Sequence, residues 1–240
     1  MNWNFYFTNL DETLRNHGPI LDNSQIPKVH GLNLNYSYRH DIKKACIIQG
    51  AESNRCQKSV EKLGLAAIPI FSWNFLDTVP VTLSQYSNLE ISNLQPPEPY
   101  KSQSWFKNLK LVSHILTYKE VTRILNHATA WQYSIETGDP VVILEHDTEL
   151  LSCPKDHFPR GSIIGLGGEA WNDHNFNIRC TGSPWAYSVD PFVAQALQTQ
   201  LLTLGLREPL ELLLRDDLYT IVQSPKIQAR RISSWSNSAF

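Results

Sequence analysis

The 240-residue sequence predicts an α/β fold with a mostly parallel central sheet flanked by helices. Short apolar runs of strand length alternate along the chain with longer segments whose apolar residues recur at helical spacing. Successive strand, helix and strand signals form β-α-β units, which build parallel sheets with helical crossovers. With 42% hydrophobic and 18% charged residues, the chain has ordinary globular composition and is long enough to bury a full core.

The first β-α-β unit begins with an apolar strand at residues 45–48. Ser53 can cap the following helix, which we expect to continue to about Leu63 and to end at Gly64. The apolar run 66–71 then provides the second strand. Two strands joined by one helix in this way are expected to lie parallel in the same sheet.

A long helix and the strand directly after it form the second crossover. We expect the helix from about Leu111 to Thr137, with Gly138-Asp139-Pro140 as its stop and the strand 141–144 following at once. The apolar stripe of the helix consists of Val121, Ile124, Leu125, Ala128, Trp131 and Ile135. The strand has four apolar residues in a row, which predicts burial on both of its faces.

The C-terminal part continues the alternation of strands and helices. Three strands and a short helical segment are expected at 162–166, 184–189, 218–222 and 208–215. Asp190 followed by Pro191 predicts the capped start of a helix, so Asp190 is not assigned to catalysis. This helix is expected to reach about Leu204 and to end at Gly205. Residues 230–240 are polar and are expected to fray.

We expect a single domain over residues 1–240. Residues 1–41 are an N-terminal extension to which the pattern assigns no element. Residues 76–108 form a long loop or insertion, rich over most of their length in Ser, Pro, Asn and Gln.

Composition excludes several classes of protein. A formal charge of −2 gives no electrostatic footprint for nucleic acid. No apolar run approaches the roughly 18 residues of a membrane span, and the N-terminus lacks the basic start and apolar segment of a secretory signal. The four cysteines lack CxxC spacing, which argues against a zinc knuckle and is typical of reduced thiols in a cytoplasmic protein.

Two acids that directly follow the buried strand, Glu145 and Asp147, are the main functional signal. Residues two apart on a strand point the same way, about 7 Å apart along the backbone. Ligands of open α/β sheets bind at the carboxyl ends of the strands. Two carboxylates aimed at one point there suit a divalent cation that carries a diphosphate. The alternatives are solvated acids, or a turn capped by Asp147 with Thr148.

A series of landmarks carries a family resemblance. They are a strand with Arg55 on the helix after it, Ser113-His114 before the helix with Trp131, Gly-Asp-Pro before Val-Val-Ile-Leu, Glu145-His146-Asp147, the segment from Gly182 to Ser188, and Asp216-Asp217. This order resembles glycosyltransferase family 25, the lipooligosaccharide and collagen galactosyltransferase-like enzymes. The resemblance covers roughly residues 44–228 and is tight over 112–150. The family motif is commonly Glu-Asp-Asp, so His146 departs from it at the central position.

The resemblance implies a GT-A fold, in which a Rossmann-like sheet binds a sugar nucleotide through Mn²⁺ or Mg²⁺. The implied activity is transfer of a hexose, with galactose as one candidate, from a UDP-sugar donor to a glycan or another hydroxyl acceptor. The family usually inverts the configuration of the anomeric carbon.

The same resemblance assigns candidate roles to residues of this chain. Asp147 is the first choice for a metal ligand, and Glu145 would bind the metal directly, through water, or bind the donor ribose. His146 is a candidate third ligand or packs against the sheet. His114 would reach the donor diphosphate or order the metal loop, and Arg55 would pair with phosphate. The packing of His114 in the core and an exposed Arg55 are the alternatives.

Inversion requires a base that takes the proton of the acceptor hydroxyl. Asp217 and Asp216 are candidates because they lie between a helix and the closing strand, and Glu169 is a rival after a glycine pair. Each of the three can instead be a solvated loop acid. Trp171 and Trp185 can stack on an acceptor sugar or pack in the core.

Two other classes of protein remain open. Paired acids on a strand also serve metal-dependent phosphoesterases, which would need a second cluster of His and Asp ligands. The unusual His146 leaves a second alternative, in which the chain is a non-catalytic glycan-binding or scaffolding domain of the same fold.

Overall fold

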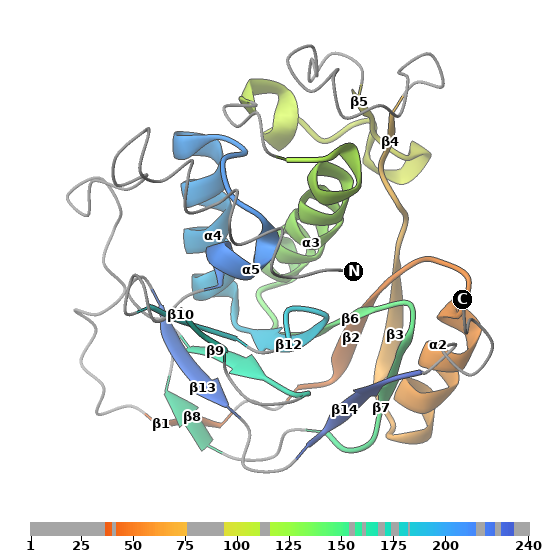
Figure 1. The fold of residues 1–240 in the computed structure, drawn as a ribbon. Helices are drawn as coiled ribbons and strands as arrows, with labels where there is room; N and C mark the ends of the chain where they lie inside the picture. Colours follow the sequence, from red (N-terminus) through yellow and green to blue (C-terminus); the bar gives the residue numbers. More distant parts are fainter. Residues whose placement is uncertain are drawn as a thin grey trace, which may run out of the picture.

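A computed structural model shows the fold of the chain (Figure 1). It describes residues 37–39, 42–75, 94–110, 116–153, 157–159, 162–167, 171–173, 178–181, 183–214, 219–223 and 227–232. The predicted extension at 1–41 therefore lies largely outside the described residues, and so do residues 76–93 of the predicted loop at 76–108, whereas residues 94–108 are described and contain a short strand and two 3₁₀ turns.

A six-stranded sheet organises the described part of the chain. Its strands lie in the order β13 (Thr220–Gln223), β9 (Ser162–Gly165), β12 (Ala186–Val189), β6 (Val141–Glu145), β2 (Lys44–Ile48) and β3 (Ala66–Ile70). β2 is parallel to β3 and β6, and β13 is parallel to β9. β12 is antiparallel to both β6 and β9. The sheet is therefore mixed and mostly parallel, which confirms the predicted α/β class.

Helices cover both faces of this sheet (Figure 1). They are α2 (Ser53–Lys62), α3 (Tyr118–Thr137), α4 (Pro191–Leu204) and α5 (Leu210–Leu213). Val141 and Ile143 of β6 pack in one core with α3 and α4. Val142 and Leu144 pack with α2 in a second core on the opposite face. All four side chains are fully buried, so the prediction of a strand buried on both faces is confirmed.

Smaller elements surround the sheet. They are β1 (Ser37–Arg39), β4 (Asn74–Phe75), β5 (Leu94–Gln95), β7 (Thr148–Leu150), β8 (His157–Pro159), β10 (Trp171–Asp173), β11 (Ile178–Cys180), β14 (Ala229–Arg231) and the 3₁₀ turns Glu98–Tyr100 and Trp105–Asn108. Within the described residues, no helix is both long and apolar enough to cross a membrane.

The ribbon formed by β7 and β14 corrects the expectation that residues 230–240 fray. Ala229, Arg230 and Arg231 pair antiparallel with Leu150, Glu149 and Thr148. The backbone of this C-terminal segment is therefore bonded to the residues that follow the acid pair. Ala229 is buried in the same core as α2, which anchors the ribbon to the sheet. Residues 233–240 lie outside the described part.

Two predicted helix starts also need correction. The N-cap of α2 is Glu52 rather than Ser53, because the Ser53 hydroxyl accepts from the Gly50 N–H at 2.7 Å and donates back to the Gly50 carbonyl at 2.9 Å. α3 begins at Tyr118 rather than near Leu111, because Thr117 and Glu120 form a capping box. Thr117 Oγ1 accepts from the Glu120 N–H at 3.2 Å, and Glu120 Oε2 accepts from the Thr117 N–H at 2.7 Å.

The predicted start of α4 is confirmed. Asp190 is its N-cap and accepts a hydrogen bond from the Val193 N–H at 2.8 Å, with Pro191 as the first helical residue. Gly138 and Gly205 end α3 and α4 as expected.

Removal of the α3 cap should destabilise the protein. We expect Thr117→Ala to lower the free energy of unfolding by about 1 kcal/mol, because one amide of the first turn loses its acceptor. Thr117→Ser keeps the hydroxyl and should cost much less. Urea denaturation followed by circular dichroism compares the two variants, and equal midpoints would contradict the capping role.

Candidate functional site

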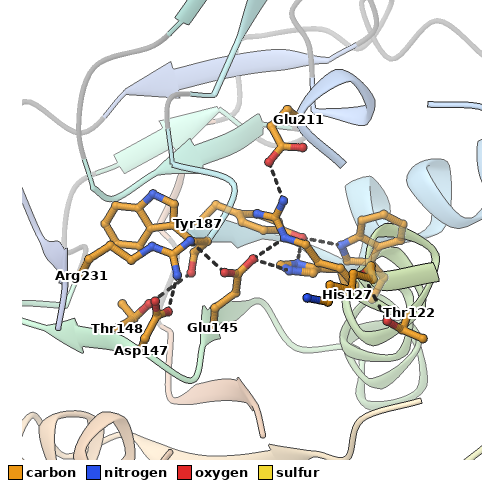
Figure 2. Close-up of polar contacts among 12 residues, drawn as sticks. Thr122, His127, Glu145, Asp147, Thr148, Tyr187, Glu211 and Arg231 are labelled. Atoms are coloured by element: carbon orange, nitrogen blue, oxygen red, sulfur yellow. Dashed lines mark hydrogen bonds and ion pairs between the residues drawn. The ribbon is translucent and has the colours of Figure 1, made fainter. Parts of the chain in front are cut away.

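The acid pair lies at the carboxyl end of β6. Glu145 is the last residue of this strand and is the register partner of Ile48, which ends the parallel strand β2. Asp147 follows in the turn that leads into β7. The two carboxylates approach the same guanidinium, that of Arg231 (Figure 2). They therefore converge, but Asp147 lies in the turn after β6 and not on the strand, so the expected strand alternation is not the cause.

Arg231 bridges the two acids. Its Nη2 lies 2.9 Å from Glu145 Oε2, and its Nη1 donates to Asp147 Oδ1. The backbone holds this arginine from both sides, because Arg231 is the register partner of Thr148 and the next amide, Ile232 N–H, donates to the Asp147 carbonyl at 2.6 Å. The acid pair and its counter-charge are thus parts of one hydrogen-bonded ribbon.

Trp185 supports the guanidinium from the side. The Arg231 Cζ atom lies 5.1 Å from the centroid of the Trp185 ring, within the range of a cation–π contact. The Trp185 carbonyl also accepts from the Glu145 N–H at 2.9 Å. Gly167 makes room for the ring, because a Cβ at that position would lie 2.1 Å from Trp185 Cη2. Trp185 was a candidate for stacking on a sugar, and in this structure its ring contacts Arg231.

A second arginine, Arg123 of α3, reaches Glu145 from the opposite direction. Arg123 Nε donates to Glu145 Oε1 at 2.6 Å, and Arg123 Nη1 donates to Glu211 Oε1 of α5 at 2.5 Å. The side chains of Glu145 and Arg123 are 13% and 28% exposed. Helices α3 and α5 are therefore tied to the end of β6 through charges that are largely removed from water.

A buried polar chain runs from Glu145 into the core. Trp131 Nε1 donates to the Tyr187 hydroxyl at 2.9 Å, and this hydroxyl lies 2.9 Å from His127 Nδ1 (Figure 2). The indole of Trp131 can only donate, so the Tyr187 hydroxyl accepts from it. The hydroxyl hydrogen of Tyr187 is then available to donate to His127 Nδ1. The network thus assigns the imidazole proton to Nε2, which lies 3.5 Å from Glu145 Oε1.

These contacts determine the charge state of Glu145. Burial is the largest influence and by itself raises the pKa of this carboxyl, but the contact with His127 and the charges of Arg123 and Arg231 outweigh it and hold the pKa well below its usual range. The His127 separation of 3.5 Å is long for a hydrogen bond, so the two guanidiniums are the firmer part of this stabilisation. Burial lowers the pKa of His127, which keeps the imidazole neutral. Glu145 is therefore a fixed anion rather than a base.

His146 lies against the turn that follows β2. A Cβ on Gly50 would come within 2.4 Å of His146 Cδ2, so only glycine fits beneath the ring. The His146 Nδ1 atom is buried and makes no hydrogen bond within the described part of the chain. The contact corresponds to the packing role considered for this residue.

The structure does not bring Arg55, another of the candidate residues, to the acid pair. Arg55 is exposed on α2, and no described contact joins its guanidinium to Glu145 or Asp147. The remaining candidates lie outside the described residues: His114, Glu169, Asp216 and Asp217. Trp171 is described only as part of the backbone of β10. Cys46 and Cys56 are buried thiols, in line with the prediction of reduced cysteines.

The acid pair does not fit a divalent cation in this arrangement. Mn²⁺ and Mg²⁺ need several oxygen ligands around one point, whereas Glu145 Oε2 and Asp147 Oδ1 are bonded to Arg231. Among the described residues, no group of three or more His, Cys, Asp or Glu side chains could hold a metal ion. A cation can enter between the two acids only if Arg231 withdraws.

Three residues of this cluster were not identified from the sequence. Arg123 and His127 are four apart on α3, beside the apolar stripe, and this spacing shows that they share a face but not that the face meets an acid. Arg231 lies in a segment expected to fray. A signal was present in the alternation of apolar and polar residues from Ile227 to Arg230, but it was too short to predict a strand.

Comparison with known proteins adds no assignment. No protein-family model matches the chain, and no curated protein matches it.

We expect Glu145→Gln to lower the free energy of unfolding at pH 7 by about 3 kcal/mol, because two guanidiniums lose a buried counter-charge. The depressed pKa of Glu145 stabilises the fold above the pKa of the unfolded chain, and this contribution is lost as the pH falls through the folded pKa. The difference from wild type should therefore shrink below about pH 5. Urea denaturation at several pH values measures it.

Glu149→Gln is the matched control for this experiment. Glu149 pairs with Arg230 at 2.8 Å on the same ribbon, with side chains that are 26% and 61% exposed. We expect a loss of at most about 1 kcal/mol. A Glu145→Gln effect as small as this, or one that stays constant down to about pH 3, would show that the cluster does not stabilise the fold as described.

Gly167→Ala should displace Trp185 and destabilise the protein by about 1–3 kcal/mol, because the new methyl group overlaps the indole ring and lies 2.9 Å from the Ala229 carbonyl. In a double-mutant cycle with Trp185→Ala, the cost of the added methyl group should fall once the ring is gone. Thermal unfolding of the four proteins gives the coupling, and additive effects would argue against this contact.

Proposed function

We propose that the chain is a glycosyltransferase of GT-A type that transfers a hexose from a nucleotide sugar, with UDP as the expected nucleotide, to a hydroxyl group of a glycan or another acceptor. The observation that supports this most is the position of Glu145 and Asp147 at the carboxyl end of β6 in a mostly parallel sheet. Ligands of open α/β sheets bind at this edge. The resemblance of the segment 112–150 to glycosyltransferase family 25 supplies the class of substrate.

In the proposed reaction the acceptor oxygen attacks the anomeric carbon and the bond from this carbon to the diphosphate oxygen breaks. The acceptor proton passes to a base, for which Asp217, Asp216 and Glu169 remain the candidates. Glu145 is a poor base because its pKa is held below the usual range. We assign Glu145 to orienting the arginines at the end of β6.

The departing diphosphate needs positive charge nearby. Arg231 is the cation of the cluster that a ligand can reach most readily, since its side chain is 40% exposed and that of Arg123 is 28% exposed. A metal-dependent form of the reaction, with Mn²⁺ or Mg²⁺ on Asp147 and Glu145, is a separate proposal. It requires Arg231 to leave the acid pair when the donor binds.

A second candidate function is a non-catalytic glycan-binding or scaffolding domain of the same fold. The observation that favours it is that the carboxylates of Glu145, Asp147 and Glu211 are all paired with Arg123 or Arg231. Such mutual pairing suits a structural cluster as well as a catalytic one. A metal-dependent phosphoesterase is supported less, since it needs further His and Asp ligands beside the acid pair.

A thermal-shift assay with UDP-galactose and UDP-glucose tests the proposal. We expect at least one donor to raise the midpoint of unfolding, because a ligand that binds only the folded state stabilises it. Asp147→Ala should abolish the shift and the slow release of UDP from that donor, whereas Glu149→Ala, which changes the neighbouring ion pair, should retain both. Absence of any shift and of any UDP release in the wild-type protein would support the non-catalytic candidate.

A further inference from the structure

We propose that Arg231 is the resident cation of the acid pair, so that the wild-type protein binds neither Mn²⁺ nor Mg²⁺ at Glu145 and Asp147. The guanidinium contacts Glu145 Oε2 through Nη2 and Asp147 Oδ1 through Nη1, so it engages one oxygen of each carboxylate. The inference deepens the proposed function and rests on it for the choice of ion. That Arg231 contacts both acids follows from the geometry of the ribbon formed by β7 and β14 and does not depend on the proposed function.

The first argument is the number of acceptors that are already used. Glu145 Oε1 accepts from Arg123 at 2.6 Å and faces His127, and Oε2 contacts Arg231 at 2.9 Å. Asp147 Oδ1 accepts from the other nitrogen of the same guanidinium. A carboxylate oxygen that bonds a guanidinium has less capacity left for a metal ion. An incoming ion that uses both carboxylates would therefore compete with these contacts for Glu145 and for Asp147 Oδ1.

The second argument is that Arg231 is held in place. Its strand pairs with β7, and the amide that follows it bonds to the Asp147 carbonyl at 2.6 Å. The Trp185 ring lies beside its guanidinium, and this ring packs closely against Gly167. Rotation of Arg231 away from the acids would give up the ion pairs and the ring contact together.

The third argument is local repulsion at the Glu145 carboxylate, since the cluster as a whole joins three carboxylates to two guanidiniums. Arg123 and Arg231 both contact this carboxylate, so a doubly charged ion bound to it would lie close to two positive groups. Salt screens charges that are partly shielded from water less than it screens exposed charges. Removal of Arg231 would eliminate a guanidinium that contacts both Glu145 and Asp147.

The neighbouring pair of Arg230 and Glu149 provides an internal comparison. It lies on the same two strands, one residue away, and joins an arginine to a carboxylate at 2.8 Å. Successive residues of a strand point to opposite faces, so Arg230 is directed away from the acid pair. Loss of Arg230 should therefore remove one positive charge from the ribbon without opening the space between Glu145 and Asp147.

Binding of Mn²⁺ alone tests the inference without any donor or activity. The electron paramagnetic resonance signal of free Mn²⁺ is recorded as protein is added, for wild type, Asp147→Asn, Arg231→Ala, Arg230→Ala, Arg231→Lys and the double variant Arg231→Ala/Asp147→Asn. We expect wild type, Arg230→Ala and Arg231→Lys to leave the signal unchanged. Arg231→Ala should bind Mn²⁺ at least about tenfold more tightly than wild type, and the added Asp147→Asn should abolish the gain.

Specific outcomes would overturn the proposal. Wild-type binding of Mn²⁺ that Asp147→Asn removes would show that the pair is a metal site, and this comparison is decisive even if Arg231→Ala does not fold. A folded Arg231→Ala protein, verified by circular dichroism, that gains no Mn²⁺ binding would show that Arg231 is not what excludes the ion. Failure of UDP-sugars to bind with or without Mn²⁺ would count against the proposed function and leave the Mn²⁺ result unaffected.

Discussion

The carboxylate of Glu145 is the constraint on which the arrangement of this sheet edge depends. It ends a fully buried strand, and a carboxylate that is so far removed from water must be paired with positive charge. Arg123 from α3 and Arg231 from β14 supply this charge, and His127 contacts the same carboxylate from within the core. One anion therefore links three elements, namely β6, the helix α3 that precedes it and the C-terminal strand β14.

The surroundings of this cluster are adapted to its contacts. Tyr187 links His127 to Trp131, so the imidazole has a defined orientation towards Glu145. Gly167 admits the ring of Trp185, and that ring lies against Arg231. Rigid support of this kind is what a binding site needs to hold charges in a set geometry, and it is also what a purely structural ion-pair network needs. The two interpretations differ in whether a ligand competes for the guanidinium of Arg231.

Local sequence patterns predicted the central sheet and its helices well, because they depend on short-range signals. The strand at 141–144 and the helix start at Asp190 are each explained by residues within a few positions of each other in the sequence. The convergence of Glu145 and Asp147 was expected from strand alternation, whereas in the structure it arises from the turn that places Asp147 after β6. The partners of these acids were not predicted, because Arg123 and Arg231 reach them across 22 and 84 residues, and a single sequence contains no local signal for such a pairing.

The distance of Arg231 along the chain has a consequence for the order in which the protein is made. The acids leave the ribosome well before the arginine that lies 84 residues after Asp147. During that interval Glu145 can pair with Arg123 but not with β14, so the edge of the sheet is assembled without its second guanidinium. Completion of this edge therefore has to wait until the segment that contains Arg231 has been synthesised.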